Sequence, residues 1–283
     1  MQFERVGVVG AGTMGSGIAQ CLALSGIDVV LIDVTREALE RGMGGLSGSL
    51  ARLVSKEALT REEADRALAR IEASMDYARL AEVDLVIEAA TENFDLKTRI
   101  LKQVDAIVRQ STVIASNTSS ISITALAAML TNPYRFIGMH FFNPVPVLPL
   151  VEIIRGLQTS DEVARAVGEL AQRIGKTPIA VKNSPGFVVN RILVPMINEA
   201  FLVLAEGVAT AEEIDAGMKL GANHPIGPLA LADLIGLDVC LAVMNVLAGD
   251  FGDPKYRTSP LLREMVAAGH LGRKTKQGVY SYA

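Results

Sequence analysis

The sequence lacks several features that would assign it to a class directly. It has only two cysteines in 283 residues, and it contains no low-complexity segment and no short repeat. Cys21 and Cys240 lie far apart, outside any CxxC or metal-ligand spacing, so we expect each to be a small buried hydrophobic side chain in a reducing compartment. The sequence therefore predicts neither a disulfide framework nor a metal site.

Membrane insertion and nucleic-acid binding are disfavoured as well. No apolar run approaches the ~18 residues that a membrane span needs. The first residues, MQFERVGVVGAG, enter a structured motif at once and leave no room for a secretory signal. The net charge is −4 with both signs mixed throughout, so there is no basic stripe for a phosphate backbone. We expect a soluble cytoplasmic protein with no membrane or nucleic-acid partner.

The N-terminal segment predicts a dinucleotide-binding βαβ unit. A Val-rich strand leads through glycines into a helical pattern, and a second strand, DVVLID, follows. In the G-x-G-x-x-G motif, Gly10 permits the tight turn, Gly12 lets a pyrophosphate approach the backbone, and Gly15 lets helix and strand pack closely. The N-terminus of the helix would face the phosphates with free N–H groups. The alternative is a glycine turn that serves packing alone.

Asp33, at the end of the second strand, indicates which dinucleotide is bound. Its carboxylate would accept hydrogen bonds from the adenosine ribose 2′-OH and would repel a 2′-phosphate. NAD is therefore favoured over NADP. NADP stays open only if Arg36, three residues further on, meets a 2′-phosphate.

Strands and helices alternate through the first half of the chain. Strands are expected at 83–90, 112–116, 135–141, 150–154 and 177–182, with helices such as 95–108 and 122–130 between them. This alternation predicts an α/β fold with a Rossmann-type, doubly wound, mostly parallel sheet, whose ligand crevice lies beyond the carboxyl ends of the strands. The polar run ASNTSS leaves a strand at that crevice. We expect some of its hydroxyls to face a ligand and Ser120 or Ser122 to cap the next helix.

The second half of the chain changes character. Apolar patterns of helical period replace the strands, at 188–205, 211–220, 229–247 and 259–268. We place a domain boundary near residue 184, with a nucleotide-binding domain at 1–184 and an all-helical domain at 185–283. The stretch GPLALADLIGLD is apolar around most of a helix and must be covered, either by a second copy of the chain or by its own domain.

Of the three histidines, one is expected at the crevice. His140 ends a predicted strand, whereas His224 and His270 look like loop or helix-end residues. Glu152 lies in the apolar run LVEII, where a carboxylate needs a partner. If Glu152 contacted one ring nitrogen of His140, it would fix the tautomer and leave the other nitrogen to exchange a proton with a substrate. The alternative is a core histidine and an edge-strand glutamate that never meet.

Seven ordered motifs carry a resemblance to a known family. GAGTMGSGIAQ, EAATEN, SNTSS, HFFNPVP, LVEII, NSPGFVVNR and MKLGANHPIGPLALADLIGLD resemble the short-chain L-3-hydroxyacyl-CoA dehydrogenases, above all the bacterial 3-hydroxybutyryl-CoA dehydrogenases. The resemblance extends to GRKTKQGVY near the C-terminus. It implies a homodimer through the helical domain and reversible hydride transfer between NAD(H) and C3 of 3-hydroxybutyryl-CoA or acetoacetyl-CoA, in fatty-acid or butanoate metabolism.

The resemblance also implies roles for individual residues. His140 would be the general acid/base and Glu152 its orienting partner, while Ser119 would bond the substrate near its reacting oxygen and Asn190 would position the substrate. The cofactor would lie along Gly10, Gly12, Thr13, Met14, Gly15, Asp33, Glu92, Lys97, Asn117, Ser119, Asn143 and Lys274. CoA would contact Ser49, Lys56 and Ser119. Lys56 fits because a flexible ammonium is a sensible phosphate partner; the alternative is a solvated helix-end lysine.

Two rival functions remain at this point. A β-hydroxyacid dehydrogenase acting on free acids would share the glycine motif and a helical second domain. The motif pattern of such enzymes includes a catalytic lysine. The HFFNP motif together with Glu152 argues against this reading. A binding protein without turnover, such as a redox sensor or a lens crystallin, would bind NAD without hydride transfer. Every catalytic position that matches the family motif is filled here, which favours an enzyme.

Overall fold

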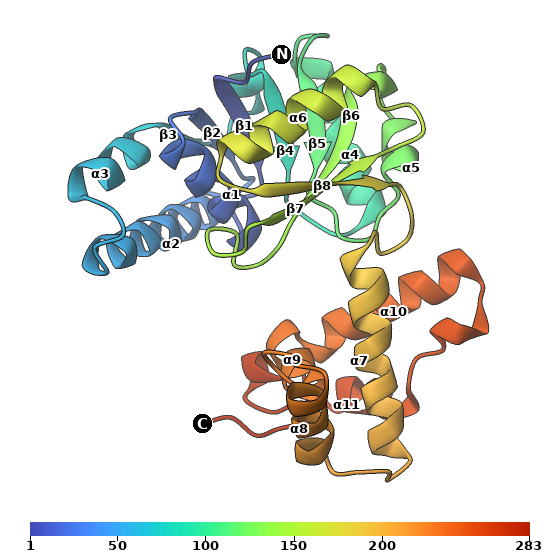
Figure 1. Ribbon diagram of the computed structural model, residues 1–283. Helices are drawn as coiled ribbons and strands as arrows, with labels where there is room; N and C mark the ends of the chain where they lie inside the picture. Colours follow the sequence, from blue (N-terminus) through green and yellow to red (C-terminus); the bar gives the residue numbers. More distant parts are fainter. The chain divides into compact units, whose positions relative to one another are not determined.

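The protein consists of two compact units. The computed structural model describes residues 1–283 and divides into Met1–Asn183 and Ser184–Ala283 (Figure 1). This division lies one residue before the boundary expected from the sequence pattern. Each unit has a hydrophobic core of its own.

An eight-stranded sheet in the order β3-β2-β1-β4-β5-β6-β7-β8 forms the centre of the first unit. The strands are β1 Arg5–Val9, β2 Asp28–Ile32, β3 Ile71–Ser74, β4 Leu85–Glu88, β5 Val113–Ser116, β6 Phe136–Phe141, β7 Leu150–Arg155 and β8 Thr177–Lys182. All pairs are parallel except β6 with β7. The chain moves from β1 to β2 on one side and to β4 on the other, so the switch point lies between β1 and β4. The predicted Rossmann-type sheet is confirmed.

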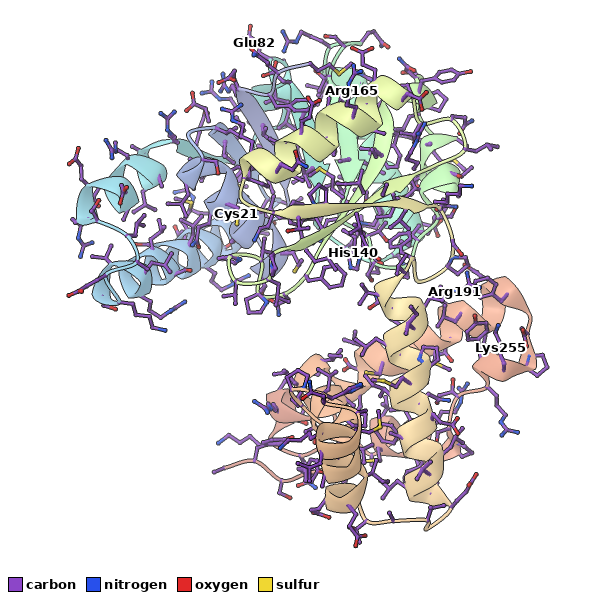
Figure 2. The ribbon with its side chains drawn as sticks, in the orientation of Figure 1. Cys21, Glu82, His140, Arg165, Arg191 and Lys255 are labelled. Carbon is purple, nitrogen blue, oxygen red and sulfur yellow. The ribbon has the colours of Figure 1, made fainter.

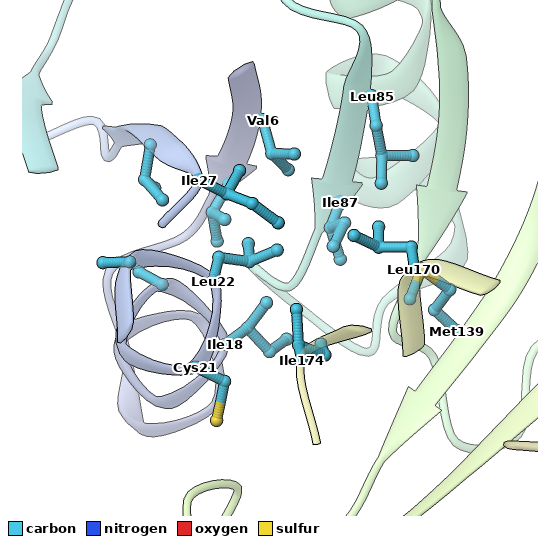
Figure 3. Packing of buried hydrophobic residues seen from close by; sticks show 14 of the residues in the cluster. Val6, Ile18, Cys21, Leu22, Ile27, Leu85, Ile87, Met139, Leu170 and Ile174 are labelled. Atoms are coloured by element: carbon cyan, nitrogen blue, oxygen red, sulfur yellow. The ribbon is translucent and has the colours of Figure 1, made fainter. Parts of the chain in front are cut away.

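Six α-helices complete the first unit. They are α1 Thr13–Leu24, α2 Arg36–Ser55, α3 Arg61–Ala69, α4 Phe94–Ile107, α5 Ile123–Ala127 and α6 Asp161–Arg173. Helix α1 buries Ile18 and Leu22 in a core that also includes β-strand residues such as Val6 and Ile87 (Figure 3). Ser122 caps α5, because its Oγ accepts the N–H of Ala125 at 3.2 Å. Ser122 is thus the capping residue of the two serines considered from sequence.

Helix α2 runs through a glycine-rich stretch. Its helical form is unexpected for so many glycines, which cost up to about 1 kcal/mol each relative to alanine. A close contact accounts for one of these glycines, Gly42, since a Cβ there would lie 2.4 Å from the Ala11 oxygen. The missing side chain lets α2 pack directly on the loop that follows β1.

The second unit is all-helical, as expected. Its α-helices are α7 Val189–Ala205, α8 Ala211–Gly221, α9 Pro228–Ile235, α10 Leu237–Phe251 and α11 Pro260–Ala267. The single helix expected at 229–247 is wrong: the chain breaks at Gly236, where φ is 106°. In α9, Leu229 and Ala232 belong to the unit's own core, while Leu234 stays exposed.

No single helix is long and apolar enough to cross a membrane. Only α9 and α10 taken together pass such a test by length and composition, and they meet at a bend of 97°.

Candidate active site

A crevice of about 540 Å³ opens beside the glycine loop in the first unit. Its walls come from the loop after β1, the end of β2, helix α2 and the segment after β6. Among the residues that the sequence assigned to cofactor or CoA, six line it: Gly10, Gly12, Thr13, Asp33, Ser49 and Asn143. The crevice therefore brings together residues from widely separated parts of the chain.

The glycine loop has the shape that a pyrophosphate needs. Gly10 has a φ of 104°, and a Cβ on Gly15 would lie 1.7 Å from the Gly10 oxygen. Around Gly12, by contrast, a Cβ would meet nothing within 4 Å. No side chain caps the start of α1, so its first N–H groups stay available to an anion in the crevice. The tight packing and the open approach fall where the motif predicted them.

The Asp33 carboxylate is held by two backbone N–H groups. Its Oδ2 accepts from Ala11 at 2.7 Å and its Oδ1 accepts from Val34 at 2.7 Å. Each oxygen keeps acceptor capacity for a further donor, so the geometry suits a ribose diol. Arg36 is exposed and does not line the crevice, whereas Arg41, five residues further along α2, does.

A buried ion pair lies at the end of β4, two residues before Ala90, which lines the crevice. Lys97 and Glu88 are 1% and 0% exposed, and Nζ lies 2.5 Å from Oε2. Glu88 also accepts from Ser116 Oγ at 2.8 Å and from the Ala90 N–H at 2.9 Å. Lys97 was expected along the cofactor, but its side chain is enclosed and holds carboxylates in place. Its second carboxylate is Glu92, 3.9 Å from Nζ.

Glu92 organises the polar run after β5. Its Oε1 accepts five hydrogen bonds from three consecutive residues. The donors are Thr118 Oγ1 at 2.7 Å, Ser119 N at 2.9 Å and Oγ at 3.0 Å, and Ser120 N and Oγ at 3.0 Å each. The many small hydroxyls of this run therefore converge on one carboxylate. Sequence reasoning assigned Glu92 to the cofactor and did not foresee this contact.

His140 and Glu152 meet across the antiparallel pair of strands. They are register partners in β6 and β7, and His140 Nδ1 lies 2.7 Å from Glu152 Oε2. Figure 2 labels His140 in the first unit. The two residues are 6% and 0% exposed. Asn117, at the end of β5, fixes the neighbouring backbone by accepting the Phe141 N–H at 2.9 Å. The alternative in which the histidine and the glutamate never meet is thus excluded.

The other sequence-assigned residues lie elsewhere. Met14 packs against the hydrophobic core, and Lys56 is exposed at the C-terminal end of α2. Asn190 is the second residue of α7 in the second unit. Lys274 belongs to the same unit, where its Nζ lies 2.5 Å from Asp238 Oδ1. Neither is among the residues that the first unit gathers at its crevice.

A histidine held by a buried carboxylate can move a proton, but it cannot take up a hydride. The same unit contains a crevice shaped for the cofactor that can. A histidine that moves the proton and an NAD site that provides the hydride acceptor together define an NAD-dependent dehydrogenase.

The chain matches two family models almost from end to end. The 3-hydroxyacyl-CoA dehydrogenase NAD binding domain matches residues 5–184, and the C-terminal domain of the same enzymes matches residues 186–282. The protein belongs to the 3-hydroxyacyl-CoA dehydrogenase family, and it is an NAD-dependent oxidoreductase.

Individual relatives agree in name. The probable 3-hydroxybutyryl-CoA dehydrogenase of Deinococcus radiodurans is 55% identical over 98% of this chain and 100% of its own length. The 3-hydroxybutyryl-CoA dehydrogenase of Bradyrhizobium diazoefficiens is 52% identical over 99% of this chain and 96% of its own. The crystal structure of (S)-3-hydroxybutyryl-CoA dehydrogenase from Ralstonia eutropha is similar with a TM-score of 0.97, at 63% identity and full coverage of both chains.

Proposed function

We propose that this enzyme interconverts (S)-3-hydroxybutyryl-CoA and acetoacetyl-CoA with NAD(H). The observation that carries the proposal is the buried contact between His140 and Glu152 in the unit that holds the dinucleotide crevice. The shared name of relatives above 50% identity supports the four-carbon acyl chain.

His140 is the general acid/base of this proposal. The carboxylate of Glu152 accepts a hydrogen bond from Nδ1–H, which fixes the tautomer and directs Nε2 to take the proton of the C3 hydroxyl. The imidazolium that forms is stabilised by Glu152, and it returns the proton to the ketone oxygen in the reductive direction. Bound NAD supplies the acceptor for the hydride that leaves C3. One hydride and one proton thus leave the alcohol, which is two electrons and two protons in total, and a ketone remains.

The remaining residues hold the reactants. The glycine loop, Asp33 and Asn143, which line the crevice, bind the dinucleotide. Ser119, set in place by Glu92, contacts the substrate near its reacting oxygen and Ser49 contacts CoA. Asn190, in the second unit, positions the substrate. Lys56, at the end of α2, binds a CoA phosphate. We assign Lys274 to the cofactor as well.

We extend the proposal to the state of the protein in the cell. The second unit serves as a dimerisation domain, and exposed apolar residues such as Leu234 and Leu220 support it. The location is cytoplasmic, in agreement with two unpaired, buried cysteines. The pathway is fatty-acid or butanoate metabolism.

Absorbance at 340 nm tests the reaction. Purified protein with NADH and acetoacetyl-CoA should lose the NADH signal, whereas free acetoacetate or NADPH should give little change. Activity on the free acid would refute the requirement for a CoA ester. NADH binding without turnover of acetoacetyl-CoA would refute the proposed reaction.

His140→Ala tests the acid/base assignment. A well-placed general base contributes about 10² to 10⁴-fold, so kcat should fall within that range while NADH binding stays close to wild type. His270→Ala, in the second unit, is the matched control and should retain full turnover. Unchanged kcat in His140→Ala would refute the assignment.

A further inference from the structure

A buried lysine lies behind one wall of the crevice. Lys176, directly before β8, is 8% exposed. Its Nζ donates to the Val145 oxygen at 2.5 Å and to the Leu148 oxygen at 2.9 Å. Main-chain carbonyls rather than a carboxylate thus satisfy this ammonium. A buried charge is costly unless it is well hydrogen-bonded, so its position fixes the backbone of that segment strongly.

The segment that Lys176 holds is the connection between the strands of the catalytic pair. It runs over residues 142–149, from the end of β6 to the start of β7. Asn143 and Val145 belong to it and line the crevice, together with both prolines between residues 143 and 147. Lys176 therefore anchors the crevice wall from the side that faces away from the ligand space.

Helix α1 supports the same wall from another direction. A Cβ on Gly17 would lie 2.8 Å from Val145 Cβ, so helix and wall are in close contact. Cys21, one turn further on, places its Sγ 3.9 Å from the Val145 oxygen. Burial raises the pKa of the Cys21 thiol, although nearby Lys176 acts to lower it. The thiol is thus neutral at pH 7, and the ammonium supplies the charged hydrogen bonds at this carbonyl.

The catalytic pair is set by different contacts. His140 and Glu152 are register partners within the β6–β7 ladder, and Glu152 is in turn paired with Ile179 of β8. Those ladder hydrogen bonds do not involve the Lys176 side chain. Removing the ammonium should therefore move the wall without changing the histidine–carboxylate contact.

We propose that Lys176 is a positioning residue of the dinucleotide site, which acts by holding the Val145 and Leu148 carbonyls so that the 143–146 wall keeps its shape. The proposal rests on the NAD-dependent activity, and it concerns cofactor affinity rather than the acyl substrate.

Lys176→Met is the direct test, because Met retains the apolar stem and loses all three donors. We expect the Kd for NADH to rise about tenfold, a change equivalent to the loss of one charged hydrogen bond. The KM for NADH should rise with it, while kcat falls less than about threefold and the pH profile of kcat keeps its midpoint. Because the chain has no tryptophan, the Kd is read from the fluorescence of NADH itself. This titration needs no acyl substrate, so it stays informative whatever the acyl specificity is.

Two further variants control the experiment. Lys182→Met removes an exposed lysine from the other end of β8 and should leave the Kd unchanged. Lys176→Gln keeps a shorter donor, so we expect a Kd between wild type and Met; it also replaces the Met variant if that protein fails to fold. An unchanged Kd in a folded Lys176 variant with a lowered melting temperature would show a purely structural role. A shifted pH midpoint with an unchanged Kd would place Lys176 with the catalytic pair. Either result overturns the proposal.

Discussion

The buried ion pair between Lys97 and Glu88 gives the sharpest prediction for stability. Both side chains are enclosed, at 1% and 0% exposure, and their charged atoms are 2.5 Å apart. Lys97→Met leaves the Glu88 carboxylate with two neutral donors, Ser116 Oγ and the Ala90 N–H. Removing one partner of a buried pair costs about 3–5 kcal/mol. In a unit of this size 1 kcal/mol lowers the melting temperature by about 2–4 °C, so we expect a fall of roughly 6–20 °C.

A double variant separates the lost charge from the lost side chain. With Glu88→Gln added to Lys97→Met, the enclosed unpaired carboxylate is removed, and at least half of the lost stability should return. Glu92 also loses the ammonium, but it is 42% exposed and keeps the hydrogen bonds of the polar run. Calorimetric melting of the two single variants and the double variant completes the thermodynamic cycle. Lys102→Met is the control, since Lys102 is exposed on the same helix. A loss below about 1 kcal/mol in Lys97→Met, or a double variant as unstable as the single one, would refute the reasoning.

Two further predictions concern acid stability and the glycine loop. Burial acts to raise the pKa of Asp105, but the Thr131 N–H at 2.8 Å and the Arg135 guanidinium at 2.6 Å hold it below its usual value. A carboxyl with a lowered folded-state pKa stabilises the protein above its unfolded-state pKa, about 3.9, and this is lost as pH falls through the folded value. Asp105→Asn should therefore lower urea-unfolding stability more at pH 7 than at pH 3, and an equal loss at both would contradict the assignment. Gly15→Ala places a Cβ 1.7 Å from a backbone oxygen and should abolish NADH binding in a fluorescence titration; Gly44→Ala, with open space around its Cβ, should bind normally, and equal affinities would oppose the close-packing argument.

The parts of the fold that sequence predicted best are those with a local signal. The glycine loop and its flanking strands follow from turn chemistry and a continuous apolar run, which need no knowledge of distant residues. Strand β3 was missed because it has only four residues and lies at the edge of the sheet, with one fully buried side chain. The break between α9 and α10 was missed because a single glycine inside an apolar pattern is compatible with a continuous helix. Only the φ of Gly236 shows the turn.

For the site, sequence identified residue types better than it identified their surroundings. The pairing of His140 with Glu152 could be anticipated because two strands joined by a short connection bring their residues into register. The burial of Lys97 could not be anticipated, since a lysine at the fourth position of an amphipathic helix is compatible with either an exposed or an enclosed side chain. Its burial depends on Glu88, which lies in strand β4. Pairing between a strand and the following helix depends on how the two elements pack, and it has no signature in a single sequence.

The polar run after β5 shows how such a distant partner changes the chemistry of a site. Five donors converge on Oε1 of Glu92, which is more than the lone pairs of one oxygen accept in good geometry. The two backbone N–H groups are fixed, so the three hydroxyls compete for the remaining acceptor capacity. Ser119 is the most exposed of the three, and its hydroxyl can therefore leave Glu92 for a ligand at the least cost, because its neighbours still satisfy the carboxylate. The loop thus keeps its shape while one hydroxyl becomes available, which is what a group that binds a substrate oxygen requires.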